Sequence, residues 1–137
     1  SIAKLGFDPL TDMPALQSFQ ESLGKRKANL KGLLLNQNFA AGVGNWLADE
    51  ILFQAGIAPT RRANSLKAEE SRCLYDALIK IVKTAVELDA DKSRFPENWL
   101  FHHRWGHNQE AQTADGDPIK FAQMGGRTTA WVPTRQS

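Results

Sequence analysis

The chain has 137 residues, with 42% hydrophobic residues, 23% charged residues and a formal net charge of +2. This length and composition fit one domain, or two very small ones, with a real hydrophobic core, and they exclude wholesale disorder. The single cysteine excludes an internal disulfide and favours a reducing, intracellular compartment, and no apolar run approaches a membrane span or the apolar core of a signal peptide.

Three helices are predicted in the first part of the chain, over residues 14–24, 30–36 and 46–55. Asp12 and Asn29 precede the first two helices and are residue types that cap helix N-termini. Asn45 starts the third helix, directly after a turn that contains two glycines. The pattern predicts a group of helices joined by short connections.

The longest predicted helix covers about residues 67–88 and follows Ser65. Aliphatic residues recur along it at helical spacing, which predicts one buried face. Cys73 lies beside this face, so we expect it to be a small buried residue and not a nucleophile.

The last third of the chain has a different pattern. A polar stretch between Gly106 and Gly116 is typical of a mobile loop. Two runs with the period-two alternation of strands follow, and the Gly125-Gly126 pair between them predicts a β-hairpin at about residues 118–133. The predicted fold class is therefore mainly α, with a small C-terminal β-hairpin.

Positive charge is concentrated in two segments. Residues 24–35 contain four basic residues and no acid, and residues 119–137 contain three basic residues and no acid. If the fold brings the segments to one face, that face attracts phosphate groups although the whole chain is nearly neutral. The alternative is ordinary solvated surface.

The glycine turn before the third predicted helix is the first candidate phosphate site. Gly42 and Gly44 permit close approach of a ligand to the backbone. The first amides of the helix that begins at Asn45 point outward at the positive end of the helix dipole, where phosphate oxygens bind. Asn45 adds a side-chain donor, and Lys31 on the preceding helix adds a positive charge. The alternative is a tight connection in which the glycines serve packing alone.

The predicted hairpin is the second candidate. Arg127 follows its glycine pair, and a guanidinium group presents a planar set of donors that suits phosphate oxygens. Taken alone, this arginine could equally be an exposed hairpin residue without a ligand. The presence of both candidate sites in one chain favours a phosphate-binding function.

Both segments resemble motifs of one family. Residues 33–59, from Leu-Leu-Leu-Asn-Gln through Gly-Val-Gly-Asn-Trp to Gly-Ile-Ala-Pro, resemble the helix–two-turns–helix of the formamidopyrimidine-DNA glycosylase/endonuclease VIII family. Residues 125–136, Gly-Gly-Arg-Thr-Thr-Ala-Trp-Val-Pro-Thr-Arg-Gln, resemble the family's C-terminal finger hairpin. The resemblance implies a helix–two-turns–helix DNA-binding domain at residues 1–91 and a finger at residues 92–137.

The resemblance also implies a partner and its contacts. Lys31, Gly44 and Asn45 are expected to contact DNA phosphates, and Arg127 at the finger tip is expected to contact the phosphate beside an extruded nucleotide. The implied partner is double-stranded DNA that contains oxidised bases or abasic sites, bound by a monomer with no membrane and no small-molecule cofactor. Its implied location is the nucleus of a eukaryote, or the cytoplasm and nucleoid of a bacterium.

One departure from the family concerns a metal. Many members hold the finger with four zinc-binding cysteines, and the positions of the second pair are Val132 and Arg135 here. We therefore expect no zinc, as in the zincless finger of plant and fungal members. Aromatic packing is expected to replace the metal, through Trp99, Phe101, Trp105, Phe121 and Trp131.

A second departure concerns catalysis. The family's nucleophile is an N-terminal proline amine followed by a catalytic glutamate, whereas this sequence begins Ser1-Ile2 and matches the C-terminal half alone. The resemblance implies the DNA-binding half of a base-excision-repair DNA glycosylase and AP lyase for oxidised bases, with no catalytic residue and no catalytic N-terminal domain in this chain. We expect the chain alone to be inactive.

Two other functions are left open by the sequence, namely a self-standing nucleic-acid-binding module and a helical protein-interaction domain. The preferred lesion is open as well. It is expected among 8-oxoguanine, formamidopyrimidines and oxidised pyrimidines.

Overall fold

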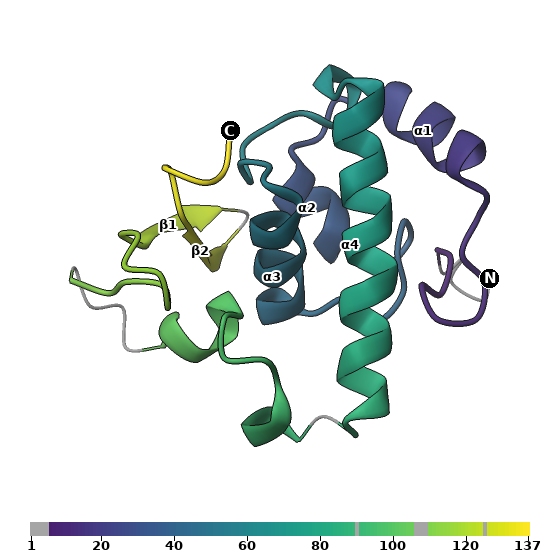
Figure 1. The fold of residues 1–137 in the computed structure, drawn as a ribbon. Helices are drawn as coiled ribbons and strands as arrows, with labels where there is room; N and C mark the ends of the chain where they lie inside the picture. The colour runs from purple at the N-terminus through teal and green to yellow at the C-terminus, as the bar shows by residue number, and fades with distance from the viewer. Residues whose placement is uncertain (1–5, 90, 106–109, 125) are drawn as a thin grey trace.

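The computed structural model describes residues 6–89, 91–105, 110–124 and 126–137. Within them the regular elements are α1 (Leu16–Gly24), α2 (Leu30–Leu35), α3 (Asn45–Ala55), α4 (Ala68–Glu87), β1 (Lys120–Met124) and β2 (Arg127–Trp131). Short 3-10 helices lie between them, η1 (Ala63–Ser65), η2 (Lys92–Arg94) and η3 (Leu100–His103). The predicted fold class, mainly α with a C-terminal β-hairpin, is confirmed (Figure 1).

The long helix α4 and the shorter α3 form the centre of the molecule. The buried residues of α4 recur at helical spacing and face the other helices, as the sequence predicts. α3 packs against α4 on one side and against β2 on the other, so it joins the helical part to the hairpin (Figure 1). No helix among the described residues is long and apolar enough to cross a membrane.

Local signals explain the start of α2 and the end of α3. The side chain of Asn29 accepts a hydrogen bond from the Gly32 amide at 2.8 Å and caps α2 as predicted. Gly56 ends α3 with a φ of 75°, a left-handed value that glycine adopts without strain. The predicted Asp12 cap is wrong, because α1 begins after Ala15 and Asp12 lies in the preceding turn.

Two apolar clusters form the core. The larger one joins all four α-helices and continues beyond residue 91 to Phe95, Trp99 and Phe101. The smaller one lies under the hairpin and is aliphatic, with Leu100, Ile119, Ala130 and Val132 each at most 2% exposed. The 3-10 helix η3 lies between the clusters, because Leu100 belongs to the smaller one while the rings on either side belong to the larger.

Of the five rings predicted to hold the finger, Trp99 and Phe101 pack its first part against the helices in the larger cluster, whereas the packing under the hairpin is mainly aliphatic. Trp105 is 53% exposed, although its ring contacts that of Phe101. Phe121 packs against the aliphatic cluster under the hairpin. Trp131 is half-buried at the end of β2, on the opposite strand face from Ala130.

Cys73 is exposed, so the prediction that it is buried is also wrong. The buried residues at this end of α4 are Ser71 and Leu74. Successive residues on a helix are about 100° apart, at 3.6 residues per turn, and Cys73 therefore faces away from both.

The hairpin is antiparallel, with Ala122 opposite Thr129 and Met124 opposite Arg127. Gly126 has a φ of 78°, as a tight turn requires. Gly125, the other residue of the predicted turn, lies outside the described residues, as do residues 106–109 of the predicted loop.

Candidate nucleic-acid interface

The turn before α3 presents backbone amides to open space. Gly42 has a φ of 85°, and Gly44, the N-cap of α3, makes no side-chain cap hydrogen bond. Gly44 is exposed, and a Cβ built on it would meet no atom of the described residues within 4 Å. Space is therefore open beside Gly44, and the unpaired first amides of a helix lie at the positive end of its dipole, which is an arrangement that binds anions.

Gln37 braces this turn from within. Its Oε1 accepts a hydrogen bond from the Gly42 amide at 2.7 Å, and its Nε2 donates to the Val43 carbonyl at 3.2 Å. The Gln37 carbonyl in turn accepts from the Gly6 amide at 2.8 Å. Sequence reasoning missed Gln37, because a glutamine before a glycine turn has no distinctive pattern.

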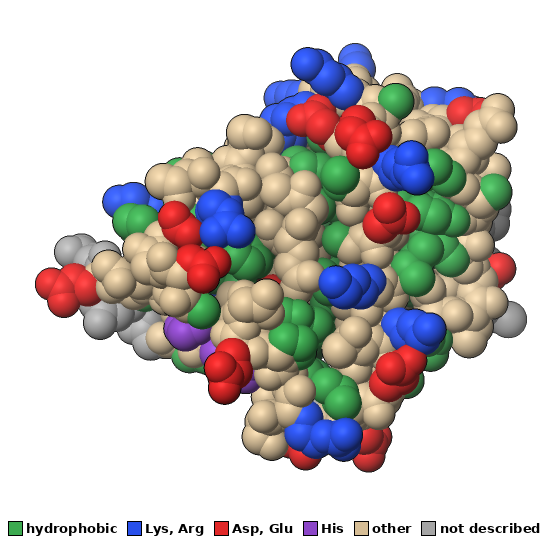
Figure 2. Space-filling view, viewed as in Figure 1, with side chains coloured by type: hydrophobic (Ala, Val, Ile, Leu, Met, Phe, Trp, Pro, Cys, Tyr) green, Lys and Arg blue, Asp and Glu red, His purple; other side chains and the backbone are tan. Residues whose placement is uncertain are grey.

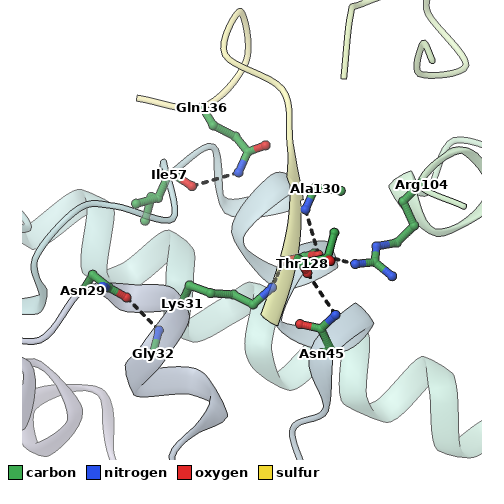
Figure 3. Close-up of polar contacts among 10 residues, drawn as sticks. Asn29, Lys31, Gly32, Asn45, Ile57, Arg104, Thr128, Ala130 and Gln136 are labelled. Atoms are coloured by element: carbon green, nitrogen blue, oxygen red, sulfur yellow. Dashed lines mark hydrogen bonds and ion pairs between the residues drawn. The ribbon is translucent and has the colours of Figure 1, made fainter. Parts of the chain in front are cut away.

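Asn45 connects the turn to the hairpin. Its Nδ2 donates to the Thr128 carbonyl on β2 at 3.0 Å. Its Oδ1 is buried and has no hydrogen-bond partner among the described residues. Asn45 therefore holds the start of α3 against β2, at the junction where the predicted phosphate ligands meet (Figure 3).

Arg127 is the exposed first residue of β2 and directly precedes Thr128. It makes no ion pair with the residues that the structure describes. Its guanidinium group is thus available to a ligand, one residue away from the Asn45 contact. Gly44, Asn45 and Arg127, predicted from separate segments, come together where α3 meets β2.

Lys31 takes a different position from the one expected. Its side chain is fully buried (Figure 3 shows it pointing toward β2), and its Nζ donates to Oδ1 of Asp49 on α3. Burial lowers the pKa of Lys31, as do the charges of Arg104 and Arg127, while Asp49 opposes the shift. Lys31 is therefore a buried ion-pair partner beneath the hairpin and not an exposed phosphate ligand.

The first basic segment is consequently divided. Lys25 and Lys27 are exposed on the connection between α1 and α2, whereas Lys31, a few residues later on α2, is buried. Figure 2 shows basic side chains at the top of the face, near this connection and the start of α4, with acidic side chains among them. Of the two basic segments, the hairpin segment places an exposed Arg127 at the α3–β2 junction.

Comparison with known proteins identifies the family of this chain. Residues 5–97 match the formamidopyrimidine-DNA glycosylase H2TH domain. The chain belongs to the formamidopyrimidine-DNA glycosylase family. A family member of Arabidopsis thaliana is 44% identical over 135 residues, which are 98% of this chain and 34% of that relative. A member of Thermus thermophilus is 39% identical over 145 residues, which cover 98% of this chain and 54% of the relative.

Solved structures of the formamidopyrimidine-DNA glycosylase family have the same fold. The Lactococcus lactis protein, in complex with DNA that contains an abasic site, has a TM-score of 0.82 at 28% identity and covers 98% of this chain. The Thermus thermophilus protein has a TM-score of 0.80 at 38% identity and covers 97% of it. The chain spans 52% and 54% of these two proteins, and thus about half their length.

The residues of the finger do not fit the zinc site that many family members have. Val132, at one expected ligand position, is fully buried in the aliphatic cluster. Arg135, at the other, donates from Nη1 to Oδ2 of Asp117 at 3.0 Å. Neither side chain ligates zinc, and the described residues contain no group of three or more His, Cys, Asp or Glu that could hold a metal.

Proposed function

We propose that this chain is the part of a base-excision-repair DNA glycosylase that binds double-stranded DNA around a damaged nucleotide. The contact between Asn45 and Thr128 carries the proposal, because it brings the open N-terminus of α3 and the free guanidinium of Arg127 to one junction. The family relationship and the Lactococcus lactis complex with abasic DNA support the same function.

The proposed contacts hold a distorted DNA backbone. A nucleotide that leaves the stack costs a few kcal/mol, and phosphate contacts on both sides of it keep the backbone in the kinked form. The amides after Gly44 and the Asn45 side chain bind phosphate from the helical side, and Arg127 binds phosphate from the hairpin. Such contacts set position and not base identity, so these residues do not choose the lesion.

The parent activity that we propose is that of a DNA glycosylase and AP lyase for oxidised bases, working in the compartment that contains the DNA. The segments of this sequence that match the family do not include its catalytic proline and glutamate. We therefore assign no catalytic residue to this chain and expect it to bind DNA without cleaving it.

Fluorescence anisotropy with a labelled duplex tests the binding function. A duplex that contains a tetrahydrofuran abasic-site analogue is compared with the intact duplex over a range of salt from about 50 to 200 mM. We expect tighter binding to the abasic analogue and a steep decline of affinity with salt. Equal affinity for both duplexes would favour a self-standing nucleic-acid-binding module, and no binding at the lowest salt would refute the proposal.

Borohydride trapping on an abasic duplex tests the assignment of catalysis. A lyase that forms a Schiff base is trapped as a covalent adduct, whereas this chain is expected to give none. An adduct would show that the chain contains a nucleophile. The Thermus thermophilus relative, treated in parallel, is the positive control.

A further inference from the structure

The second edge of β2 is paired with helix side chains in place of a third strand. One edge of β2 faces β1, and the polar groups of the other edge need partners. On this edge the Thr128 carbonyl accepts from Asn45 Nδ2 at 3.0 Å, and the Ala130 amide donates to Asp49 Oδ2 at 3.0 Å. Two side chains of α3 therefore pair with two backbone groups on this edge of the strand.

The spacing of the two contacts fixes a register. Asn45 and Asp49 are four residues apart on α3, a rise of about 6 Å along a helix axis. Thr128 and Ala130 are two residues apart on β2, about 6.7 Å along a strand. A shift of β2 by one residue would turn these backbone groups toward β1 and present the wrong groups to α3. The paired contacts therefore exclude a one-residue shift of the hairpin on the helix.

Asp49 is the central residue of this arrangement. It is 1% exposed, and its two oxygens also receive Lys31 from α2 and Arg104 from the segment after η3, the latter at 2.6 Å. One carboxylate thus connects three segments to β2. Removing a buried partner of this kind is costly, since it leaves charges unpaired in the interior.

We infer that Asp49 is a positioning residue, which fixes the register of the hairpin on α3 and thereby the place of Arg127 relative to Asn45 without a metal. Arg127 lies three residues before Ala130, at the start of the strand that Asp49 holds. The inference rests on the proposed DNA-binding function.

A matched pair of variants isolates the hydrogen-bond acceptor from the charge. Lys31→Met combined with Asp49→Ala removes one cation and the anion, so the net charge of the cluster is unchanged while the acceptor for the Ala130 amide is lost. Lys31→Met combined with Asp49→Asn has the same charge and restores an amide oxygen that can accept. Asp76→Ala, which removes an exposed carboxylate on α4, is the control for a surface substitution.

Amide hydrogen exchange measures directly whether the Ala130 amide is still hydrogen-bonded, and thereby whether β2 keeps its register on α3. We expect the Ala130 amide to exchange about 100-fold faster in the alanine variant, and within about tenfold of the parent in the asparagine variant. Amides of the α4 core, such as that of Leu78, are expected to keep their protection in both. An unchanged Ala130 amide in the alanine variant would overturn the inference.

The affinity for the abasic-analogue duplex measures whether a displaced hairpin impairs the proposed phosphate contact of Arg127. We expect the alanine variant to bind about tenfold more weakly, and Arg127→Ala to add less than about twofold to that loss, because the guanidinium is already misplaced. In the asparagine variant, Arg127→Ala is expected to have its full effect. Equal affinities of the two variants would overturn the inference, as would an asparagine variant that fails to fold.

The two proposals fail in different ways. If the parent chain does not bind DNA, the proposed function fails, and exchange of the Ala130 amide still decides whether Asp49 holds the strand. If the parent binds and both variants bind equally, the DNA-binding function stands and the positioning role of Asp49 is refuted.

Discussion

Replacement of Arg127 by alanine is expected to change the salt dependence of DNA binding. Arg127 is exposed and has no ion pair with any described residue, so in the complex its charge is free to neutralise a phosphate. Each neutralised phosphate contributes about 0.9 to the slope of log affinity against log salt. Over a fourfold rise in salt, from about 50 to 200 mM, the loss of one contact therefore removes about a 3.5-fold change in affinity.

Anisotropy titrations of the abasic-analogue duplex at four salt concentrations measure this slope for each variant. Arg127→Ala is expected to reduce the slope by about 0.9. Asn45→Ala is expected to weaken binding by a similar factor at every salt concentration with an unchanged slope, because a neutral donor displaces no counterion. Arg72→Ala removes an exposed arginine of α4 and is the matched control.

Two results would refute this reasoning. An unchanged slope in Arg127→Ala would show that its guanidinium does not contact phosphate. An equal reduction in Arg72→Ala would show that the slope reports overall charge and not a contact at the α3–β2 junction. Thermal unfolding of Asn45→Ala is recorded in parallel, since that variant also loses the hydrogen bond to Thr128.

Three further predictions follow from single positions. A Cβ on Gly44 meets no described protein atom within 4 Å, so Gly44→Ala is expected to reduce the free energy of unfolding by about 1 kcal/mol at most. The added methyl group is expected to obstruct the phosphate and to weaken DNA binding about tenfold, and unchanged binding would show that Gly44 is not part of the interface. Arg61 lowers the pKa of Glu70 to about 2, so this pair stabilises the fold above pH 4.5 and its contribution is lost as the pH falls through 2. Because the pair is partly exposed, Glu70→Gln is expected to reduce the free energy of unfolding by about 1 kcal/mol at pH 7 and by little at pH 2, as measured by urea unfolding. A loss of stability that does not depend on pH would contradict the role of this ion pair. The exposed Cys73 is expected to react with a thiol reagent in the folded protein as fast as a free thiol, and a protected thiol would contradict its exposure. The substitution Cys73→Ser is expected to change the free energy of unfolding by less than about 0.5 kcal/mol.

The helices could be predicted from the sequence because their signals are local. Asn29 caps α2 through a residue three positions on, and Gly56 ends α3 through its own φ. Asp12 was a false signal, since a capping residue type is common at helix starts but does not by itself locate one, and α1 begins after Ala15 without a side-chain cap. Exposure of Cys73 depends on which face of α4 the neighbouring elements cover. The spacing of apolar residues along the sequence does not define the covered face near the ends of the helix.

The candidate ligands could be predicted for the same reason, but their arrangement could not. Gly44, Asn45 and Arg127 are recognisable from the chemistry of turns and hairpins. The contact between Asn45 and Thr128 joins residues 83 positions apart, which no local pattern reveals. Burial of Lys31 depends on Asp49, whose position near the start of a helix is equally typical of a solvent-exposed acid.

Two consecutive acids on α3 explain how the finger is held. Asp49 accepts from the Ala130 amide on β2, and its neighbour Glu50 accepts from the Leu100 and Phe101 amides at the start of η3, at 3.0 and 2.7 Å. Burial raises the pKa of Glu50, and the amide hydrogen bonds oppose that shift. A zinc ion would join residues of the finger to one another, whereas these carboxylates join the finger to the helix whose first turn faces the proposed phosphate site. In this chain the same helix therefore both presents the proposed phosphate ligands and contacts the hairpin that carries Arg127.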